Sequence, residues 1–274
     1  MYHNREFWKN IALDTSSVEI IKEITDQYII SYEKDNTVQA FMDYLEFDNL
    51  DDFKTIASRY ISKFKEMGVS QFLINTRQSD PLQIPEETIE ALGGHFLVEL
   101  SDCGVSITQE LVDQLATNLP DGYSIREVPV EELKDRQDIF EMIFRNFKEG
   151  FAPSVDSLHQ GFLRSHDRNY KMGITRIYHL IEHNRQPVSF SLTRFFPDGP
   201  REGLVHLGLG VTDKEHQRKG LYKNLLNARL TAALQKGYKF AFTESDVETS
   251  RPILGKLGLK EFDRTHLALF SLKE

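Results

Sequence analysis

The stretch that decides the fold is LVHLGLGVTDKEHQRKGLYKNLL, residues 204–226. Its apolar first part predicts a strand over 203–211, and the spacing of the later apolar residues predicts a helix over 218–236. Residues 217–222 therefore form a strand-to-helix turn. Such a turn leaves backbone N–H groups unpaired at the positive end of a helix dipole, which is a suitable place for a pyrophosphate.

The composition of this turn fits an anionic ligand. Gly220 lets the backbone approach phosphate oxygens closely. The helix that follows carries apolar residues on two nearly opposite stripes, so we expect one side to be covered by a sheet and the other by a helix or by the N-terminal domain. The basic residues of the turn are Arg218, Lys219 and Lys223, and the stripes are Leu221, Leu225, Ala228 and Ala232 on one side and Leu226, Leu230 and Ala233 on the other.

Outward from this stretch, the chain reads as two α/β halves. The Pro-Asp-Gly sequence at 120–122 predicts a turn, and we place the domain boundary there, giving domains 1–120 and 121–274. In the first half we expect strands over 28–32, 38–47 and 71–75, a strand pair or one bulged strand over 96–107, and helices over 51–67 and after Pro85. In the second half we expect strands over 123–128, 176–182, 188–196, 203–211, 239–243 and 259–271, and helices over 130–147, 218–236 and 248–257.

Both halves end in the same order of strand, helix, short strand, short helix and strand. This order suggests an internal duplication. The alternative is that two unrelated α/β segments share the same order of elements and turns by convergence. The two halves differ at the start of the helix. Residues 48–52 are acidic where the second half is basic, so repulsion argues against a phosphate there. We expect the first half to be a degenerate companion domain.

Composition restricts the class of protein. The 274 residues are 40% hydrophobic and 27% charged, which is typical of a globular chain, and the formal net charge of −9 argues against nucleic-acid or membrane partners. The single cysteine, Cys103, can form no intrachain disulfide, which fits a reducing cytoplasm. There is no signal-like start and no apolar run near 18 residues. We expect a cytoplasmic protein without a metal, and a homodimer is left open.

The turn and a second segment resemble the GNAT superfamily of acyl-CoA N-acyltransferases. The family signature Q/R-x-x-G-x-G/A is matched by Gln217 and Gly220, while Tyr222 stands where the family has Gly or Ala. The segment TSRPILGKLGL at 249–259 is similar to the family's A-x-x-L-Y-E-K-L-G-F. Ser250 falls on its Ala, and Leu254 replaces the Tyr that protonates the departing thiolate in many members.

The resemblance covers about 122–274 and implies an α/β fold with a mixed α+β sheet, in two tandem GNAT-like copies of which the first is degenerate. It implies acetyl-CoA as co-substrate and direct transfer of the acyl group to the amine of a small molecule or peptide, with no metal and no covalent nucleophile. The strand end would pair with the pantetheine and the turn would hold the pyrophosphate. The cofactor residues would be Leu209, Gly210, Val211, Gln217, Arg218, Lys219, Gly220, Leu221, Tyr222 and Ser250.

Several side chains are candidates for proton transfer. His206 lies on the strand before the turn and has a suitable unperturbed pKa for a general base, with Glu202 and Glu244 as rivals; packing is the alternative for the histidine. Tyr222 is a candidate acid in place of the missing Tyr. The i, i+4 pair His179 and His183 lies on a predicted strand, so we expect no metal site there.

Two further clusters lie in the first part of the second half. A stripe of phenylalanines at helical spacing predicts a core face, of which some rings could also line an apolar acceptor pocket: Phe140, Phe144, Phe147 and Phe151. A basic cluster reads as a solvated face rather than a carboxylate clamp: Arg164, His166 and Arg168. Two other functions stay open, a non-catalytic CoA-binding or scaffold protein and, less favoured by the turn, a tRNA-dependent aminoacyltransferase.

Overall fold

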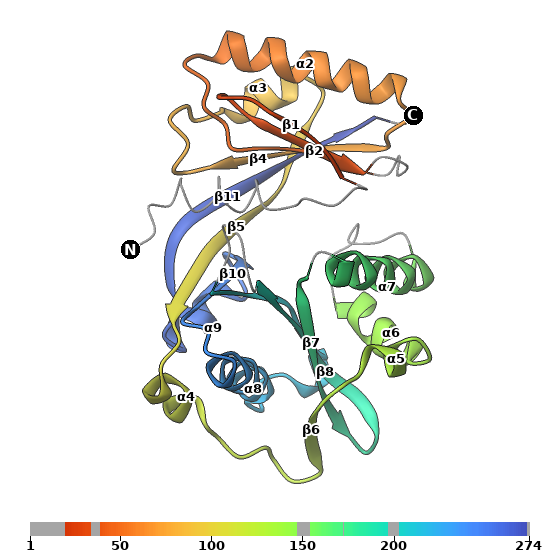
Figure 1. The fold of residues 1–274 in the computed structure, drawn as a ribbon, viewed down its shortest axis with the longest axis vertical. Coiled ribbons are helices and arrows are strands. Elements are labelled where there is room, and N and C mark those ends of the chain that lie inside the picture. The colour runs from red at the N-terminus through yellow and green to blue at the C-terminus, as the bar shows by residue number, and fades with distance from the viewer. Residues whose placement is uncertain (1–19, 34–38, 147–153, 172, 197–202, 273–274) are drawn as a thin grey trace. The chain divides into compact units, whose positions relative to one another are not determined.

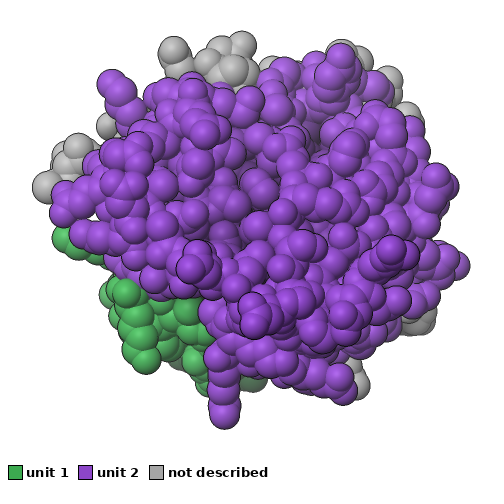
Figure 2. Space-filling model, turned by 90° about the horizontal axis from the view of Figure 1, so that it is seen from below, with its two compact units in different colours: residues 1–103, 244–256, 260–274 green, residues 104–243, 257–259 purple. Residues whose placement is uncertain are grey.

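The chain forms two compact units in a computed structural model, drawn as a ribbon in Figure 1 and coloured by unit in Figure 2. The structure describes residues 20–33, 39–146, 154–171, 173–196 and 203–272. Unit 1 comprises residues 1–103, 244–256 and 260–274, and unit 2 comprises residues 104–243 and 257–259.

Unit 1 is a sheet with helices α2 and α3 on one face (Figure 1). Its strands follow the order β1-β2-β3-β4-β11-β5. The elements are β1 Ile20–Ile24, β2 Ile29–Glu33, β3 Gln39–Asp43, α2 Leu50–Glu66, β4 Gln71–Arg77, α3 Glu86–Ala91, β5 His95–Ser106, α9 Arg251–Lys256 and β11 Lys260–Ser271.

The unit borders differ from the expected boundary at 120/121. Residues 260–274 cluster with the N-terminal residues because β11 pairs antiparallel with β4, from Thr265 opposite Arg77 to Ser271 opposite Gln71. The sequence predicted β11 as a strand but not this partner. Strand β1 was not predicted. Of the two alternatives for residues 96–107, the structure has one long strand, β5.

Aromatic side chains hold β11 in the core of unit 1. Phe64 of α2 lies 5.2 Å from Phe72 of β4, and Phe72 lies 5.9 Å from Phe270 of β11, measured between ring centroids. Phe270 is 1% exposed. A Cβ on Gly94 would lie 2.5 Å from the Phe270 ring, so a glycine is required for this close contact.

We predict that Phe270→Ala destabilises unit 1 by about 3–5 kcal/mol, since it removes a buried ring and leaves a cavity. Hydrogen exchange should quicken in α2 and in β2 to β4. Ser271→Ala, at an exposed position of the same strand, is the control. Unchanged exchange in α2 would show that β11 does not belong to this core.

Unit 2 contains a sheet covered on both faces. Its strands follow the order β10-β9-β8-β7-β6. The elements are α4 Gln109–Leu115, β6 Tyr123–Glu127, α5 Val130–Leu133, α6 Gln137–Asn146, α7 Val155–Lys171, β7 Thr175–His183, β8 Gln186–Phe196, β9 Leu204–Thr212, the short 3₁₀ helix η2 Lys214–His216, α8 Leu221–Gln235 and β10 Phe240–Asp246.

Helix α8 packs on β7, β8 and β9, and α4 packs on α8, so α8 is covered on both sides as its two stripes predicted. Helices α6 and α7 cover the opposite face of the sheet (Figure 1). Tyr178, Phe190 and Val211 point into the core beneath α6, whereas Ile181 and Val188 pack with α8.

The predicted helix over 130–147 is two helices, α5 and α6. The break between them is held by Arg136, whose guanidinium pairs with Glu132, Asp138 and Glu182. The prediction that the phenylalanine stripe faces the core was right for Phe140, which is buried. It was wrong for Phe144, which is 37% exposed because it faces away from the sheet core. Phe147 and Phe151 lie outside the described residues.

Candidate functional site

Strands β9 and β10 pair over a short distance only. Their parallel ladder runs from Leu204 opposite Phe240 to His206 opposite Phe242. The Thr243 hydroxyl then donates to the Leu207 carbonyl at 2.7 Å. Beyond this bond, the register of the described residues gives β9 a partner in β8 alone. The other edge of residues 208–212 therefore lacks a strand partner among the described residues. The carbonyls of Gly208, Val211 and Thr212 accept side-chain hydrogen bonds, and the remaining backbone groups are available to an extended ligand.

A β-bulge lies in this same part of β9. Ser191 pairs with Gly210 and Thr193 pairs with Leu207, so Leu192 stands opposite two residues, Gly208 and Leu209. A bulge bends its strand and increases the local twist. It lies one residue beyond the last bond to β10, and we attribute the divergence of β9 from β10 to it.

The turn that follows β9 has an unusual backbone. Gly220, the N-cap of α8, has φ of 76°, and Arg218 has φ of 61°. No side chain of the described residues caps the helix, and its first turn contains no acidic residue. A Cβ placed on Gly220 would meet nothing within 4 Å, so the space in front of the turn is open. The N–H groups of this terminus are accessible to an anion.

Helix α2 in the first half provides an internal comparison. Its N-cap residue Asn49 accepts a hydrogen bond from the Asp52 N–H at 2.9 Å, and Asp51 and Asp52 lie in its first turn. The protein's own side chains therefore satisfy this terminus and neutralise its dipole. The expectation that residues 48–52 do not bind phosphate stays a prediction.

Side chains distant in the sequence hold the turn in place. Arg145, at the end of α6, forms an ion pair with Asp213, and the Asn146 side chain accepts from the Lys214 N–H at 3.1 Å. The Gln217 amide donates to the Thr212 carbonyl at 3.3 Å, which ties the turn to the end of β9. Of these, sequence analysis had found Gln217 alone.

A ring cluster flanks the turn on its other side. The Lys219 ammonium donates to the Tyr123 hydroxyl at 2.9 Å, and that hydroxyl lies 2.8 Å from His216 Nδ1. Tyr123 also stacks on His183, with centroids 4.5 Å apart. Burial and the Lys219 charge lower the pKa of His216. Lys219 is thus part of the support of the turn as well as a source of positive charge.

The Tyr222 ring, in the first turn of α8, is directed toward β9. A Cβ on Gly210 would lie 3.0 Å from the Tyr222 ring and 3.5 Å from the Arg229 guanidinium. The glycine therefore allows the strand to lie directly on these two side chains. Leu209 and Val211, the other predicted strand contacts, are partly and fully buried against the core under α6. Leu221, the first residue of α8, is buried in a cluster with Ile181 and Val188 of the sheet.

His206, the predicted base, has a defined partner. Arg194 Nη1 donates to His206 Nδ1 at 3.1 Å, and the imidazole stacks on Phe242 at 4.8 Å. Because Nδ1 accepts this bond, the neutral ring carries its proton on Nε2. In this state neither ring nitrogen has a lone pair available for a substrate proton.

Three further predicted site residues remain, and two of them lie in the part of the chain that the structure describes. Glu202 lies outside the described residues. Glu244 is exposed and, with Ser250, is assigned to unit 1. The Ser250 hydroxyl donates to the Asp246 carbonyl at 3.4 Å, before α9 begins. Leu254 is 1% exposed.

The histidine pair and the basic cluster also have defined surroundings. Burial, with a contribution from Arg229, lowers the pKa of His179 to about 4, and its Nδ1 has no hydrogen-bond partner. His183 stacks on Tyr123 instead of approaching His179. Within the described ranges, the structure contains no group of three or more His, Cys, Asp or Glu side chains suited to a metal. His166 of the basic cluster lies 2.6 Å from the Tyr178 hydroxyl and is half-buried, not solvated.

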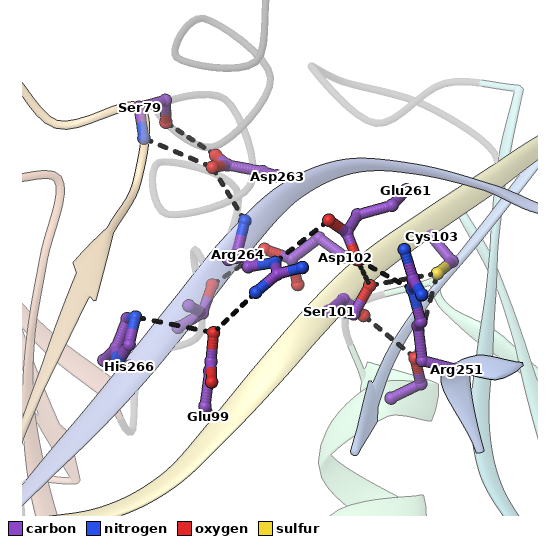
Figure 3. Close-up of polar contacts among 12 residues, drawn as sticks. Ser79, Glu99, Ser101, Asp102, Cys103, Arg251, Glu261, Asp263, Arg264 and His266 are labelled. Atoms are coloured by element: carbon purple, nitrogen blue, oxygen red, sulfur yellow. Dashed lines mark hydrogen bonds and ion pairs between the residues drawn. The ribbon is translucent and has the colours of Figure 1, made fainter. Parts of the chain in front are cut away.

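A polar cluster lies between β5 and β11 of unit 1, shown in Figure 3. The fully buried Asp102 accepts from the Thr265 hydroxyl at 2.8 Å, and its other oxygen has no partner. The Ser101 hydroxyl donates to Glu261 at 2.6 Å and lies 3.3 Å from Cys103 Sγ. Burial, aided by the charge of Glu244, raises the pKa of Asp102 to about 8.

The raised pKa of Asp102 has a predictable effect on stability. Folding keeps this carboxyl protonated, whereas the unfolded chain releases its proton near pH 4. The free energy of unfolding of wild type should therefore fall as pH rises from about 5 to 8, by up to about 1.4 kcal/mol per pH unit from this group. Asp102→Asn should flatten the slope, measured by urea unfolding. Asp48→Asn, at an exposed position of the same unit, should keep the wild-type slope, and a wild-type slope in Asp102→Asn would contradict the assignment.

Comparison with known proteins gives the fold. No family model and no curated protein matches this sequence. Among solved structures, a tandem GNAT protein from the clavulanic acid biosynthesis pathway, described without AcCoA, is 14% identical, with 90% of this chain and 79% of that chain covered and a TM-score of 0.62. A GCN5-related N-acetyltransferase from Kribbella flavida is 12% identical, with 98% and 96% covered and a TM-score of 0.65. A functionally unknown conserved protein from Staphylococcus epidermidis is 11% identical, with 93% and 96% covered and a TM-score of 0.71.

The chain therefore has the fold of the GCN5-related N-acetyltransferases, in the tandem form that the sequence predicted. The same β-α-β unit occurs twice, as β3-α2-β4 and β9-α8-β10, with a short parallel ladder in each. In the part of the chain that the structure describes, no helix has the length and apolar character needed to cross a bilayer.

Proposed function

We propose that unit 2 binds acetyl-CoA and that the protein transfers the acetyl group to an amine of a small molecule or peptide. One observation carries the proposal. The helix that follows the open strand edge begins without a cap, without acidic residues and with free space before Gly220. The corresponding helix of the other half begins with its own cap and two aspartates.

The pantetheine arm would run along β9. Its two amide groups can pair with the backbone of Leu209, Gly210 and Val211 as an added strand, because β10 leaves that edge. The pyrophosphate would accept from the N–H groups of residues 217–222, with charge from Arg218 and Lys219. These contacts would place the thioester near the point where β9 and β10 separate.

The reaction would depend mainly on proximity. An amine held beside the thioester attacks the carbonyl carbon directly, so the protein needs only to orient the two reactants and remove a proton. His206 lies next to the separation of the strands, but its Nδ1 is bonded to Arg194. A proton transfer through His206 would first require that bond to break, so water or the open candidates Glu202 and Glu244 would serve more directly.

A non-catalytic CoA-binding role is the second candidate. It is supported by Leu254, which supplies no hydroxyl where many members have an acid, and by Tyr222, whose ring packs toward Gly210. Calorimetric binding of acetyl-CoA together with thiol release over a panel of amines separates the two candidates. Binding without thiol release from any amine favours the second, and absence of binding contradicts both.

We predict that Gly220→Asp weakens acetyl-CoA binding by more than about 100-fold. A carboxylate in the open space before the turn would repel the pyrophosphate by about 3–4 kcal/mol at a typical near-surface dielectric. Isothermal titration calorimetry measures the dissociation constant. Gly237→Asp is the matched control, because Gly237 has φ of 83°, lies just after the other end of α8 and also has nothing within 4 Å of its Cβ.

The control separates binding from backbone strain. Aspartate tolerates a left-handed backbone better than most residues, and both substitutions carry a similar strain. Both variants should therefore melt at similar temperatures, while Gly220→Asp alone loses binding. Equal affinity of the two variants for acetyl-CoA would remove the turn from the proposed site.

A further inference from the structure

Arg229, in the middle of α8, is a fully buried cation that sequence analysis did not find. It is 1% exposed, and its bonds go to neutral oxygens of β8 and β9. Nε donates to the Thr193 hydroxyl at 3.1 Å, and Nη2 donates to the carbonyls of Leu192 at 2.7 Å and Gly208 at 3.0 Å. Burial lowers its pKa to about 10, so it stays charged at neutral pH. A buried guanidinium is unfavourable unless its hydrogen bonds are made, so the burial of Arg229 depends on these three acceptors.

The two carbonyls that Arg229 holds are those of the bulge. Leu192 lies opposite both Gly208 and Leu209, so the regular exchange of N–H and C=O bonds is interrupted there. Arg229 supplies the missing donors to both strands from one nitrogen. It therefore fixes the bulge and joins it to the helix whose N-terminus forms the turn.

The orientation of one peptide group follows from these bonds. The Gly208 carbonyl and the Leu209 N–H belong to the same peptide, and the described chain contains no cis peptide. In a trans peptide the two groups point in opposite directions. The carbonyl points to Arg229, which also holds Leu192 of β8, so the Leu209 N–H points away from β8, toward the edge that β10 leaves open. A cation on the carbonyl polarises the peptide and makes its N–H a stronger donor.

We propose that Arg229 is a positioning residue for acyl transfer, which holds and polarises the Gly208–Leu209 peptide so that the Leu209 N–H donates to the carbonyl oxygen of the acetyl thioester. This inference rests on the proposed function. When the amine nitrogen attacks the carbonyl carbon, the π electrons move to that oxygen, and the N–H stabilises its negative charge. Re-formation of the carbonyl expels the CoA thiolate, and the proton leaves the amine nitrogen. The Leu209 N–H keeps its own proton throughout.

The close packing around this peptide supports the role. Gly210, two residues after Gly208, lies so near Arg229 that a Cβ would be 3.5 Å from its Nη1. His179, on the same side of the sheet, has a pKa of about 4 and is neutral. Arg229 is therefore a charged group in direct contact with this part of the strand.

Infrared spectroscopy of bound acetyl-CoA, labelled with ¹³C at the thioester carbonyl, tests the inference without knowledge of the acceptor. In wild type, the carbonyl band should move to lower wavenumber on binding. Arg229→Gln removes the charge and should lose most of this shift. Thr193→Val removes one partner of Arg229 and leaves both carbonyl bonds, so it should retain the wild-type shift. Thermal unfolding verifies that each variant is folded.

The outcomes are distinguishable. Failure of wild type to bind acetyl-CoA overturns the proposed function and this inference with it. Binding without a band shift in wild type overturns the inference alone, as does an undiminished shift in Arg229→Gln. If Arg229→Gln does not fold, Arg229→Met takes its place, because an apolar side chain of similar length removes the charge and the donors without burying an unpaired polar group; an undiminished shift there also overturns the inference.

Once an amine acceptor is found, kinetics give a second readout. The kcat of Arg229→Gln should fall by about 10- to 100-fold, which is less than the loss of a whole oxyanion donor. The KM for acetyl-CoA should change by less than about 3-fold, because the peptide interacts more strongly with the transition state than with the ground state. A rise in KM with unchanged kcat would show that Arg229 only holds the cofactor strand, and would contradict the role in transfer.

Discussion

Strands β9 and β10 share three register pairs, and the hydrogen bond from the Thr243 hydroxyl to the Leu207 carbonyl lies just beyond the last pair. A strand that loses its partner on one edge has a row of unpaired polar groups, which a protein must cover or use. Here the bulge in β9 lies at the place where pairing stops, and a buried guanidinium holds the bulge. The open edge, the uncapped helix and Arg229 are thus parts of one arrangement, in which each depends on the strand keeping its bend.

The two halves of the chain show how the same β-α-β unit can be open or closed. In the first half, the β3–β4 ladder ends at Met42 and Ile74, and directly beyond it the Asn75 amide donates to Asp43 at 2.6 Å. The cap from Asn49 satisfies a backbone N–H group at the start of α2. In the second half the Thr243 hydroxyl bonds the Leu207 carbonyl at the corresponding place, but α8 begins without a side-chain cap among the described residues and without an acidic residue in its first turn. The difference lies in a few side chains and leaves the backbone plan unchanged.

The sequence predicted most strands and the turn because their signals are local: alternating apolar residues, a glycine at a left-handed position and a basic cluster. It did not predict the partner of β11, because a strand pattern does not state what the strand pairs with. It missed Arg229 because an arginine within a helix is nearly always exposed. Only the register of β8 and β9 shows that the carbonyls of Leu192 and Gly208 lack backbone donors at the β-bulge. The break between α5 and α6 depends on Arg136 and three carboxylates, of which Glu182 alone is distant in sequence.

The position of β11 has a consequence for synthesis of the chain. The sheet of unit 1 has β11 between β4 and β5, and its core includes Phe270. On the ribosome, residues 20–103 emerge long before residues 260–271, so β4 exposes an unpaired edge and an apolar surface while the whole of unit 2 is being made. N-terminal segments usually fold first during translation. Here the N-terminal unit is the last to be completed, and the interval in which a chaperone could protect the β4 edge is set by the length of unit 2.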